Sequence, residues 1–159
     1  MKVRDVMTKQ VSFCYPDTTL DKAVQSMTQK SCGFLPVVGE GGNVIGVLTD
    51  RDIALALGTR NRKASELSVW DIMTPKLFTC TAEDDIHSVL TTMRMSRVRR
   101  LPVIDTEGAP IGILSIDDIV LGAKEHSLSK DVSYKDVEDT YKSICGYTKA
   151  RGAQPRVAA

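Results

Sequence analysis

Two short stretches of this sequence place a hydroxyl side chain three residues before a carboxylate. The first is Gly46-Val47-Leu48-Thr49-Asp50-Arg51-Asp52, and the second, 66 positions later, is Gly112-Ile113-Leu114-Ser115-Ile116-Asp117-Asp118. In each, an apolar run typical of a short buried strand gives way to a helical pattern, so Thr49 and Ser115 stand at expected helix starts. There the hydroxyl and the carboxylate can cap the helix. They can also bind a nucleoside phosphate, because a helix N-terminus attracts a phosphate and an aspartate can accept both ribose hydroxyls. The residues alone leave both roles open.

Composition limits the classes of protein to consider. The chain has 159 residues, of which 42% are hydrophobic and 26% charged, with a formal net charge of +1. These values are typical of a globular protein with one compact unit or two small, mutually dependent ones. The charge excludes a broad nucleic-acid footprint, and no stretch approaches the roughly 18–20 apolar residues of a membrane span. Since Met1–Asp5 has no apolar run to serve as a signal peptide, we expect a cytoplasmic protein without nucleic-acid or membrane partners.

An internal repeat organises most of the chain. Residues 3–53 align with residues 69–119 without a gap, and fifteen of the 51 aligned positions are identical. Two copies are too few for a solenoid, which usually needs at least three. We therefore expect the copies to pack face to face about a pseudo-two-fold axis, each covering the apolar face that the other cannot bury.

Each copy predicts the order β-α-β-β-α and thus a mixed α/β fold. The expected elements of the first copy are a strand at Val11–Tyr15, a helix from Leu20, strands at Phe34–Val38 and Val44–Leu48, and a helix ending at Gly58; the second copy begins with a strand at Leu77–Thr81 and continues alike. The helices carry apolar stripes, made of Leu20, Ala23, Val24 and Met27, and of Ile86, Val89, Leu90 and Met93. The expected domains are residues 1–58 (first repeat), 59–68 (a solvated linker), 69–122 (second repeat) and 123–159 (a tail).

The tail predicts one more helix near residues 133–146. Ser133 and Asp136 can form a capping box, Gly146 can end the helix, and one face gathers Tyr134, Val137, Tyr141 and Ile144. This helix packs on the body or on a dimer mate, or it is a detachable partner helix. Lys124–Asp131 is expected to be a linker, and Lys149–Ala159 is expected to fray.

Three linked motifs now carry a family resemblance. Val-x-Asp-[Ile/Val]-Met-Thr opens each copy, Leu-Pro-Val-[Val/Ile] lies in its middle, and Ile-Gly-[Val/Ile]-Leu-[Thr/Ser]-x-x-Asp-Ile ends it. Together they resemble paired cystathionine-β-synthase (CBS) domains, known as a Bateman module, over residues 1 to about 122, and in particular small stand-alone bacterial proteins of this kind. The resemblance implies two repeats packed through their sheets. It also implies a sensor of adenosine-containing ligands (AMP, ADP, ATP, S-adenosylmethionine or NAD), bound in clefts between the repeats.

The resemblance also implies which residues bind the ligand. Asp52 and Asp118 would bind ribose, and Thr49 and Ser115 would lie near the phosphate. The cleft of Thr49 and Asp52 would be completed by Thr74 to Thr81 and by Arg99, Arg100, Leu101 and Pro102; the cleft of Ser115 and Asp118 would be completed by Thr8 to Phe13 and by Gly33, Phe34, Leu35 and Pro36.

The two expected clefts differ in charge. The run Arg97-Val98-Arg99-Arg100 has no counterpart in Ser31-Cys32-Gly33-Phe34, and Asp117 stands where the first copy has Arg51. Guanidinium groups match phosphate oxygens bidentately, whereas an acid opposes a phosphate. We therefore expect the first cleft to prefer phosphorylated ligands and the second to tolerate less phosphate or stay empty. The alternative for the arginines is a solvated basic edge.

The spacing of the remaining reactive side chains is not typical of a catalytic site. The four cysteines lack metal-ligand spacing, and Cys14 and Cys80 occupy equivalent repeat positions, which favours small core residues. His87 and His126 have no carboxylate or cysteine partner at useful spacing, and no catalytic set or phosphate-binding loop is present. We expect neither an enzyme nor a metal site, and no tightly required cofactor.

Two hypotheses of function follow. The first is a regulatory module whose adenine-nucleotide occupancy alters its shape or its surface toward a protein target. The second is a ligand-free interaction module in which the Thr/Ser-x-x-Asp pairs only cap helices. In both, a homodimer is expected, with contact faces on the motif helices at Leu55, Leu57, Ile119, Val120 and Leu121.

Overall fold

The computed structural model describes residues 1–123 and 131–150, with side chains for residues 1–123 and 131–146. Residues 124–130 of the expected linker, including His126, and the chain beyond residue 150 lie outside these residues. The chain forms two compact units. Unit 1 comprises Met1–Gln10, Phe78–Asp105 and the described residues from Ile111 on, and unit 2 comprises Val11–Leu77 and Thr106–Pro110.

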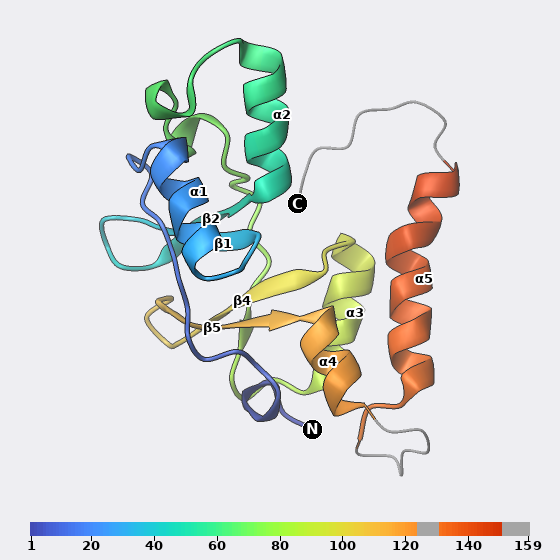
Figure 1. Ribbon diagram of the computed structural model, residues 1–159. Helices are drawn as coiled ribbons and strands as arrows, with labels where there is room; N and C mark the ends of the chain where they lie inside the picture. The colour runs from blue at the N-terminus through green and yellow to red at the C-terminus, as the bar shows by residue number, and fades with distance from the viewer. Residues whose placement is uncertain (124–130, 151–159) are drawn as a thin grey trace. The chain divides into compact units, whose positions relative to one another are not determined.

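Unit 2 is built around a two-stranded antiparallel hairpin. Its elements are α1 (Leu20–Gln29), β1 (Phe34–Val38), β2 (Val44–Thr49), α2 (Asp50–Arg60) and the short 3-10 helices η2 (Ala64–Glu66) and η3 (Val69–Asp71) (Figure 1). The pairing of β1 with β2 runs from Phe34 opposite Thr49 to Val38 opposite Val44. The turn between them uses Gly42 at φ +80°, a left-handed conformation that suits glycine. Leu20, Leu35, Leu48 and Ile53 meet in a buried core.

Unit 1 holds a three-stranded sheet in the order β3-β4-β5. Its elements are η1 (Val3–Asp5), β3 (Cys80–Thr81), α3 (Ile86–Ser96), β4 (Arg100–Ile104), β5 (Pro110–Ser115), α4 (Ile116–Gly122) and α5 (Tyr134–Ala150). The core gathers the predicted stripe of α3 with Leu101, Leu114 and Ile119, and α5 adds Val137 and Ile144. The expected mixed α/β class is confirmed.

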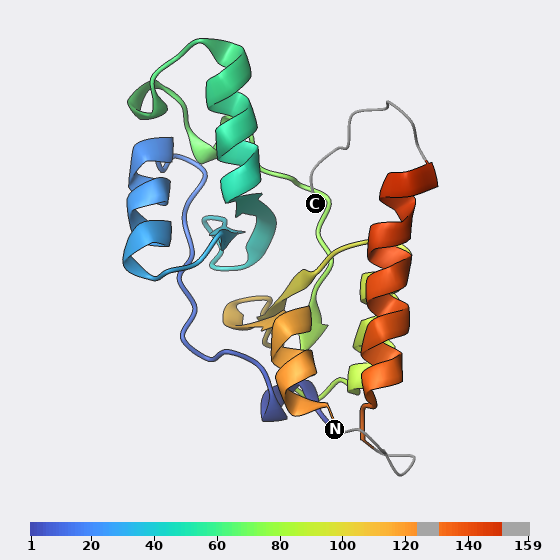
Figure 2. The same cartoon turned by 45° about the vertical axis from the view of Figure 1, so that its right-hand side comes forward.

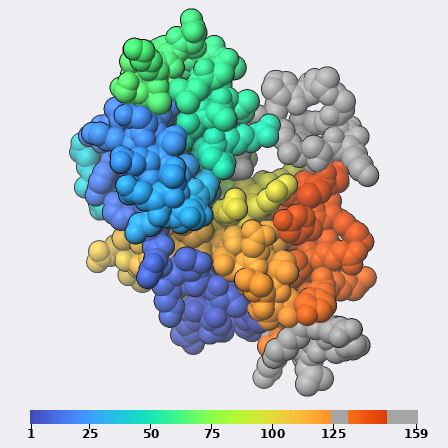
Figure 3. Space-filling view, viewed as in Figure 1, coloured from blue at the N-terminus to red at the C-terminus, as the bar shows by residue number. Residues whose placement is uncertain are grey.

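Each unit contains the opening segment of the other repeat. In unit 1, Thr8 pairs with Ile113 of β5, the two main chains exchanging hydrogen bonds of 2.9 Å. In unit 2, Thr74 pairs with Val47 of β2 in the same way. The N-terminal segment accordingly lies beside α4 (Figure 3), where a Cβ at Gly122 would come within 2.8 Å of Val6.

The motif glycines allow this close approach. A Cβ at Gly46 would lie 2.9 Å from the carbonyl oxygen of Thr74, and one at Gly112 would lie 3.1 Å from that of Thr8. Both distances are shorter than ordinary van der Waals contact, so a larger residue would push the opening segment away from the strand. The glycine of each motif therefore holds a threonine main chain beside the strand that ends at Thr49 or Ser115.

The first strand of each repeat is far shorter than predicted. Val11–Tyr15 forms only a bridge between Cys14 and Val37, and Leu77–Thr81 keeps only the two residues of β3. Cys14 donates to the carbonyl of Pro36 and accepts from the N–H of Val38. The next bond of a parallel ladder would need an N–H at Pro36, which proline lacks. Pro102 lies at the matching place beside β3, so the Leu-Pro-Val motif itself limits both strands.

Two further boundaries differ from the sequence prediction. The stretch 59–68 is not wholly solvated, because α2 continues to Arg60 and Leu67 is buried, where its carbonyl accepts the N–H of Leu20. Gly146 does not end the last helix, which runs to Ala150. A glycine inside a helix costs about 1 kcal/mol relative to alanine but does not forbid it.

The last helix packs on unit 1 through one face. Val137, Thr140 and Ile144 are buried, whereas Tyr134, expected on the same face, is 54% exposed. α5 runs alongside α3 (Figure 2) and also contacts α4. This agrees with the interpretation of α5 as a helix packed on the body.

The expected dimer residues are not equally accessible. Leu121 is 87% exposed and Leu55 and Val120 are partly so, but Ile119 has no exposed surface. Ile119 therefore cannot contact a partner, and Leu57 packs against the core of unit 2. Ile119 is buried because it lies on the side of α4 that faces the sheet core.

Candidate functional site

Thr49 and Asp52 form a reciprocal cap at the start of α2. The backbone N–H and the Oγ1 hydroxyl of Thr49 donate to Oδ2 of Asp52 over 2.9 and 2.7 Å. In return, Oγ1 of Thr49 accepts the N–H of Asp52 over 3.2 Å. The capping role that the sequence allowed is therefore real.

The second oxygen of Asp52 is left over by this cap. Oδ1 has no hydrogen-bond partner among the described residues. Every fully buried side-chain oxygen or nitrogen in the described structure has a partner, so Oδ1 is not fully buried. Asp52 as a whole is 8% exposed, and its open oxygen therefore lies at the surface. Capping and acceptance of an external hydroxyl use different oxygens and can occur together.

Ser115 and Asp118 repeat the cap at the start of α4 in unit 1. The N–H and Oγ of Ser115 donate to Oδ2 of Asp118 over 2.8 and 2.6 Å, and Ser115 Oγ accepts the N–H of Asp118 over 3.1 Å. Here the second oxygen is partly used, because Thr8 Oγ1 donates to Asp118 Oδ1 over 3.4 Å. A hydrogen bond this long is weak, so an incoming hydroxyl can replace it.

The same cap also occurs outside the predicted sites. Asp71 accepts from the N–H and hydroxyl of Ser68 through one oxygen, and Asp136 does so from Ser133. These hydrogen bonds lower the pKa of Asp71 and of Asp136. The Thr/Ser-x-x-Asp pattern by itself is therefore a general capping device in this chain.

Position distinguishes the two predicted pairs from the other caps. Each begins at the last residue of a strand, β2 or β5, and an opening-segment threonine pairs with that strand. Thr74 lies in unit 2 with Thr49 and Asp52, and Thr8 lies in unit 1 with Ser115 and Asp118. The structure thus brings together three of the predicted residues in each unit.

The predicted phosphate-binding arginines lie at the start of β4 in unit 1. Both are exposed. Arg100 Nη2 lies 4.0 Å from an oxygen of Asp117, and the Arg99 guanidinium lies over the ring of Tyr141, with Cζ 5.8 Å from its centroid. Because Thr49 and Asp52 belong to unit 2, a shared site with these arginines stays a prediction.

The apolar residues predicted to line the ligand are largely core residues. Leu35 and Leu101 have almost no exposed surface, and Phe34 is 5% exposed. The carbonyl of Pro36 accepts the N–H of Cys14, and Pro102 is buried on β4. In the described structure these residues support the strands, so their direct contact with a ligand stays a prediction.

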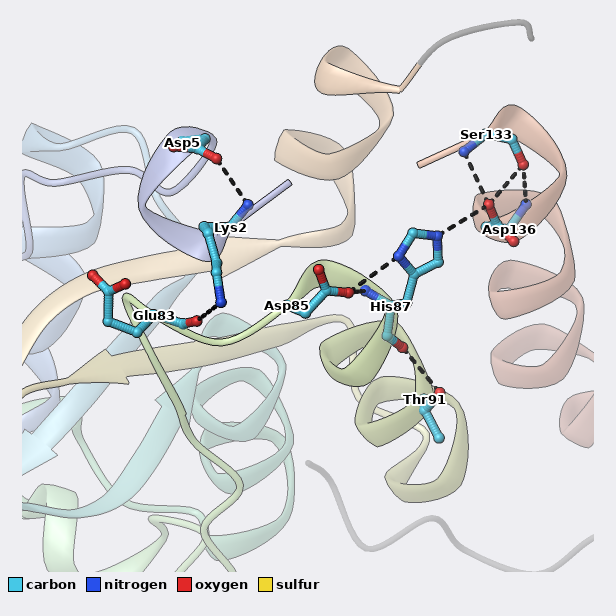
Figure 4. A network of polar contacts seen from close by, with 8 residues as sticks. All are labelled: Lys2, Asp5, Glu83, Asp85, His87, Thr91, Ser133 and Asp136. Carbon is cyan, nitrogen blue, oxygen red and sulfur yellow. Dashed lines mark hydrogen bonds and ion pairs between the residues drawn. The ribbon is translucent and has the colours of Figure 1, made fainter. Parts of the chain in front are cut away.

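His87 does have carboxylate partners, contrary to the sequence prediction. Its Nδ1 lies 3.1 Å from Asp85 Oδ1, and its Nε2 lies 3.7 Å from Asp136 Oδ2 at the start of α5 (Figure 4). Asp136 is distant in sequence, and no local spacing reveals it. The imidazole therefore joins the N-termini of α3 and α5 rather than standing alone on a polar face.

The cysteines behave as core residues where they were expected to. Cys14 and Cys80 are buried, and burial raises the pKa of each thiol to about 12. Within residues 1–123 and 131–146, no three His, Cys, Asp or Glu side chains gather as a group that could hold a metal ion. In the part of the chain that is described, no helix has the length and apolar character needed to cross a membrane.

The structure is a tandem-repeat module with two α/β units. Each unit contains one helix, α2 or α4, that begins with the same cap. The CBS domain pattern matches residues 3–59 and 69–124. The chain therefore belongs to the CBS domain family and carries two such domains, as the sequence motifs predicted.

Relatives place this pair in proteins of several kinds. The chain is 38% identical over 112 residues to the mitochondrial CBS domain-containing protein CBSX3 of Arabidopsis thaliana, covering 68% of this chain and 54% of the relative. It is 28% identical over 117 residues to homoserine O-acetyltransferase of Methanococcus vannielii, covering 74% of this chain and 24% of the enzyme. The chain thus spans about half or less of the length of these relatives.

Solved CBS domain pairs with bound adenosine compounds share the fold. The domain pair of MJ0100 in complex with 5'-methylthioadenosine and S-adenosyl-L-methionine has a TM-score of 0.68 and 26% identity, covering 76% of this chain and 98% of that chain. CBSX2 in complex with AMP has a TM-score of 0.64 and 28% identity, covering 76% and 93%. Both of these pairs therefore bind adenosine-containing compounds.

Proposed function

We propose that this protein is a regulatory module that binds an adenosine-containing ligand, with AMP, ADP or ATP as the first candidates, and that it has no catalytic activity of its own. S-adenosylmethionine and NAD are further candidates. In this proposal the carboxylates of Asp52 and Asp118 accept ribose hydroxyls. Thr49 and Ser115 lie near the phosphate end, where the first N–H groups of α2 and α4 are.

The observation that most supports this proposal is the open Oδ1 oxygen of Asp52. A residue that served only as a cap could be wholly enclosed, yet Asp52 keeps one carboxylate oxygen without a partner in the described structure and within reach of the surface. A charged acceptor forms stronger hydrogen bonds than a neutral one. The CBS pairs that contain AMP, 5'-methylthioadenosine or S-adenosylmethionine support adenosine as the ligand class.

The alternative, a ligand-free interaction module, has its own supporting observation. Every hydrogen bond of the caps at α2 and α4 is already made within the protein, so the caps need no ligand. The side chain of Leu121 is 87% exposed on α4 and offers an apolar contact for a second copy or another protein. Homodimer formation belongs to both proposals.

Two measurements separate these functions. The purified chain is denatured, and the released small molecules are identified by chromatography and mass spectrometry. Separately, melting is followed with AMP, ADP, ATP, S-adenosylmethionine or NAD at millimolar concentration. A ligand at about 100 times its dissociation constant stabilises the folded state by about 2.7 kcal/mol, which raises the melting temperature by roughly 5–10 °C. No co-purified nucleotide and no shift with any of the five compounds would support the ligand-free module.

A further inference from the structure

The guanidinium group of Arg99 lies against an aromatic ring of the C-terminal helix. Its Cζ atom is 5.8 Å from the centroid of Tyr141 on α5, within the range of about 6 Å over which a cation is attracted to a ring face. Both residues belong to unit 1. The contact therefore connects the beginning of β4 with a helix that lies outside the two CBS repeats.

The backbone of Arg99 is fixed on both sides. Its carbonyl accepts the N–H of Ile116, the first residue of α4, over 2.9 Å, and the preceding Val98 is buried in the core. The side chain of Arg99 contacts α5, whereas that of Arg100 lies near Asp117 on α4. The backbone of Arg99 is thus held in place, and the freedom that remains is in its long side chain.

The ring that meets Arg99 is held in turn by the core. Thr140, directly before Tyr141, is 1% exposed and donates to the carbonyl of Asp136, while Val137 and Ile144 are buried in the core of unit 1. Tyr141 itself is half-buried and packs against the same core. Docking of α5 thus fixes the place of the ring that the Arg99 guanidinium contacts.

Contact with a ring leaves the hydrogen-bond donors of arginine available. The five N–H donors of a guanidinium lie in its plane, whereas the attraction to the ring uses the positive charge and needs no hydrogen bond. A bidentate hydrogen bond to a phosphate uses those donors. The ring therefore does not compete with a phosphate. It limits the conformations of the flexible Arg99 side chain before a phosphate binds.

We propose that Tyr141 is a positioning residue that holds the Arg99 guanidinium for the phosphate of an adenine nucleotide, so that α5 sets the preference of this protein for phosphorylated over unphosphorylated ligands. This inference rests on the proposed nucleotide-binding function. By linkage, a phosphorylated ligand stabilises the docked state of α5 by the same factor by which docked α5 favours that ligand.

The test uses the full chain and three variants. Tyr141→Leu removes the ring, Tyr141→Phe keeps its face, and Tyr134→Leu removes an exposed ring of the same helix as a matched control. Calorimetry measures AMP and adenosine binding to each. We expect Tyr141→Leu to weaken AMP about two- to fivefold, the factor that corresponds to an exposed cation–π contact, while adenosine binding is unchanged. Tyr141→Phe and Tyr134→Leu should match the unchanged chain for both ligands.

A second variant identifies the partner of the ring. Arg99→Ala removes the cation that contacts the ring. If Tyr141 acts through Arg99, the two changes are not additive, and Arg99→Ala combined with Tyr141→Leu weakens AMP no more than Arg99→Ala alone. The double-mutant cycle also holds if Tyr141→Leu lowers the melting temperature, since each affinity is measured on folded protein.

Several results would overturn the inference. Equal losses of AMP and adenosine in Tyr141→Leu would mean that the ring only stabilises the fold, and tighter AMP binding would mean that it competes with the phosphate. If the unchanged chain binds AMP and all the Tyr141 variants bind it equally, the positioning role is refuted and the proposed function stands. If the unchanged chain binds neither ligand, the proposed function fails, and the role of Tyr141 in phosphate recognition fails with it.

Discussion

Replacing Asp52 by Asn separates its capping role from its proposed binding role. Oδ2 of Asp52 accepts both hydrogen bonds from Thr49, whereas Oδ1 is open. The asparagine amide has only one oxygen. If that oxygen takes the place of Oδ2, the cap survives and an NH₂ donor occupies the open place, where it cannot accept a ribose hydroxyl. If the amide is turned round, the acceptor is restored but the cap is lost.

The magnitude follows from the lost acceptor. A hydrogen bond to a charged group contributes about 1.5–3 kcal/mol, and 1.4 kcal/mol corresponds to a factor of ten in affinity. The Asp52→Asn variant should therefore bind nucleotide at least about tenfold more weakly. Because the cap survives, the stability of the ligand-free protein should change by no more than about 0.5 kcal/mol, a shift of about 1–2 °C in melting temperature.

The assay pairs calorimetry with melting of the ligand-free protein, and the chain offers a matched control. Asp71 accepts from Ser68 through one oxygen over 2.8 and 2.9 Å, in the same unit and in the same pattern, but no binding role is expected for it. Asp71→Asn should leave nucleotide affinity unchanged. The reasoning is refuted if Asp52→Asn binds nucleotide as tightly as the unchanged chain while its melting temperature falls, because Asp52 is then only a cap.

Three further predictions concern charge, acid and assembly. Replacing both Arg99 and Arg100 by Ala should weaken AMP and ATP, leave adenosine nearly unchanged and reduce the salt dependence of binding, since exposed charges are screened within about 8–10 Å; calorimetry showing equal losses for adenosine and ATP contradicts this. The hydrogen bonds from Ser133 lower the pKa of Asp136. The contribution of Asp136 to the stability of the folded state is therefore complete above its unfolded pKa of about 3.9 and is lost as the pH falls through its lower folded pKa. The melting temperature should fall less between pH 5 and pH 3 in Asp136→Asn than in the unchanged chain, and an equal fall contradicts the assignment. Leu121→Asp should shift a dimer toward monomer in sedimentation at tens of micromolar, and a monomeric unchanged chain removes the idea.

Most of the helices and of the hairpin strands could be predicted from the sequence because their apolar residues recur with a clear period. The stripe of α3 is buried as expected, whereas in α1 Val24 is 39% exposed beside the buried Leu20 and Met27. The first strand of each repeat was overestimated for a different reason. Its pattern is apolar, but its length depends on hydrogen bonds to a neighbouring strand, and Pro36 and Pro102 cannot donate them.

The site was predictable only as far as local spacing reaches. Thr49 with Asp52, and Ser115 with Asp118, are three residues apart, and both pairs form the expected caps. The contact of His87 with Asp136, like that of Arg99 with Tyr141, joins elements distant in sequence, and no periodic pattern records it. With 21 basic and 20 acidic residues in the chain, many pairs of opposite charge are compatible with the predicted helices.

The exchange of opening segments places residues of both repeats at the cap of α4. In unit 1, Asp118 comes from the second repeat, but the threonine that donates to its second oxygen, Thr8, comes from the first. The 3.4 Å hydrogen bond between them is weak enough for a ribose hydroxyl to replace it. Replacement would free the hydroxyl of Thr8 while its main chain stays paired to Ile113. Occupancy at Asp118 would thereby alter the side-chain contacts of the first repeat's opening segment within one compact unit, without any element having to unfold.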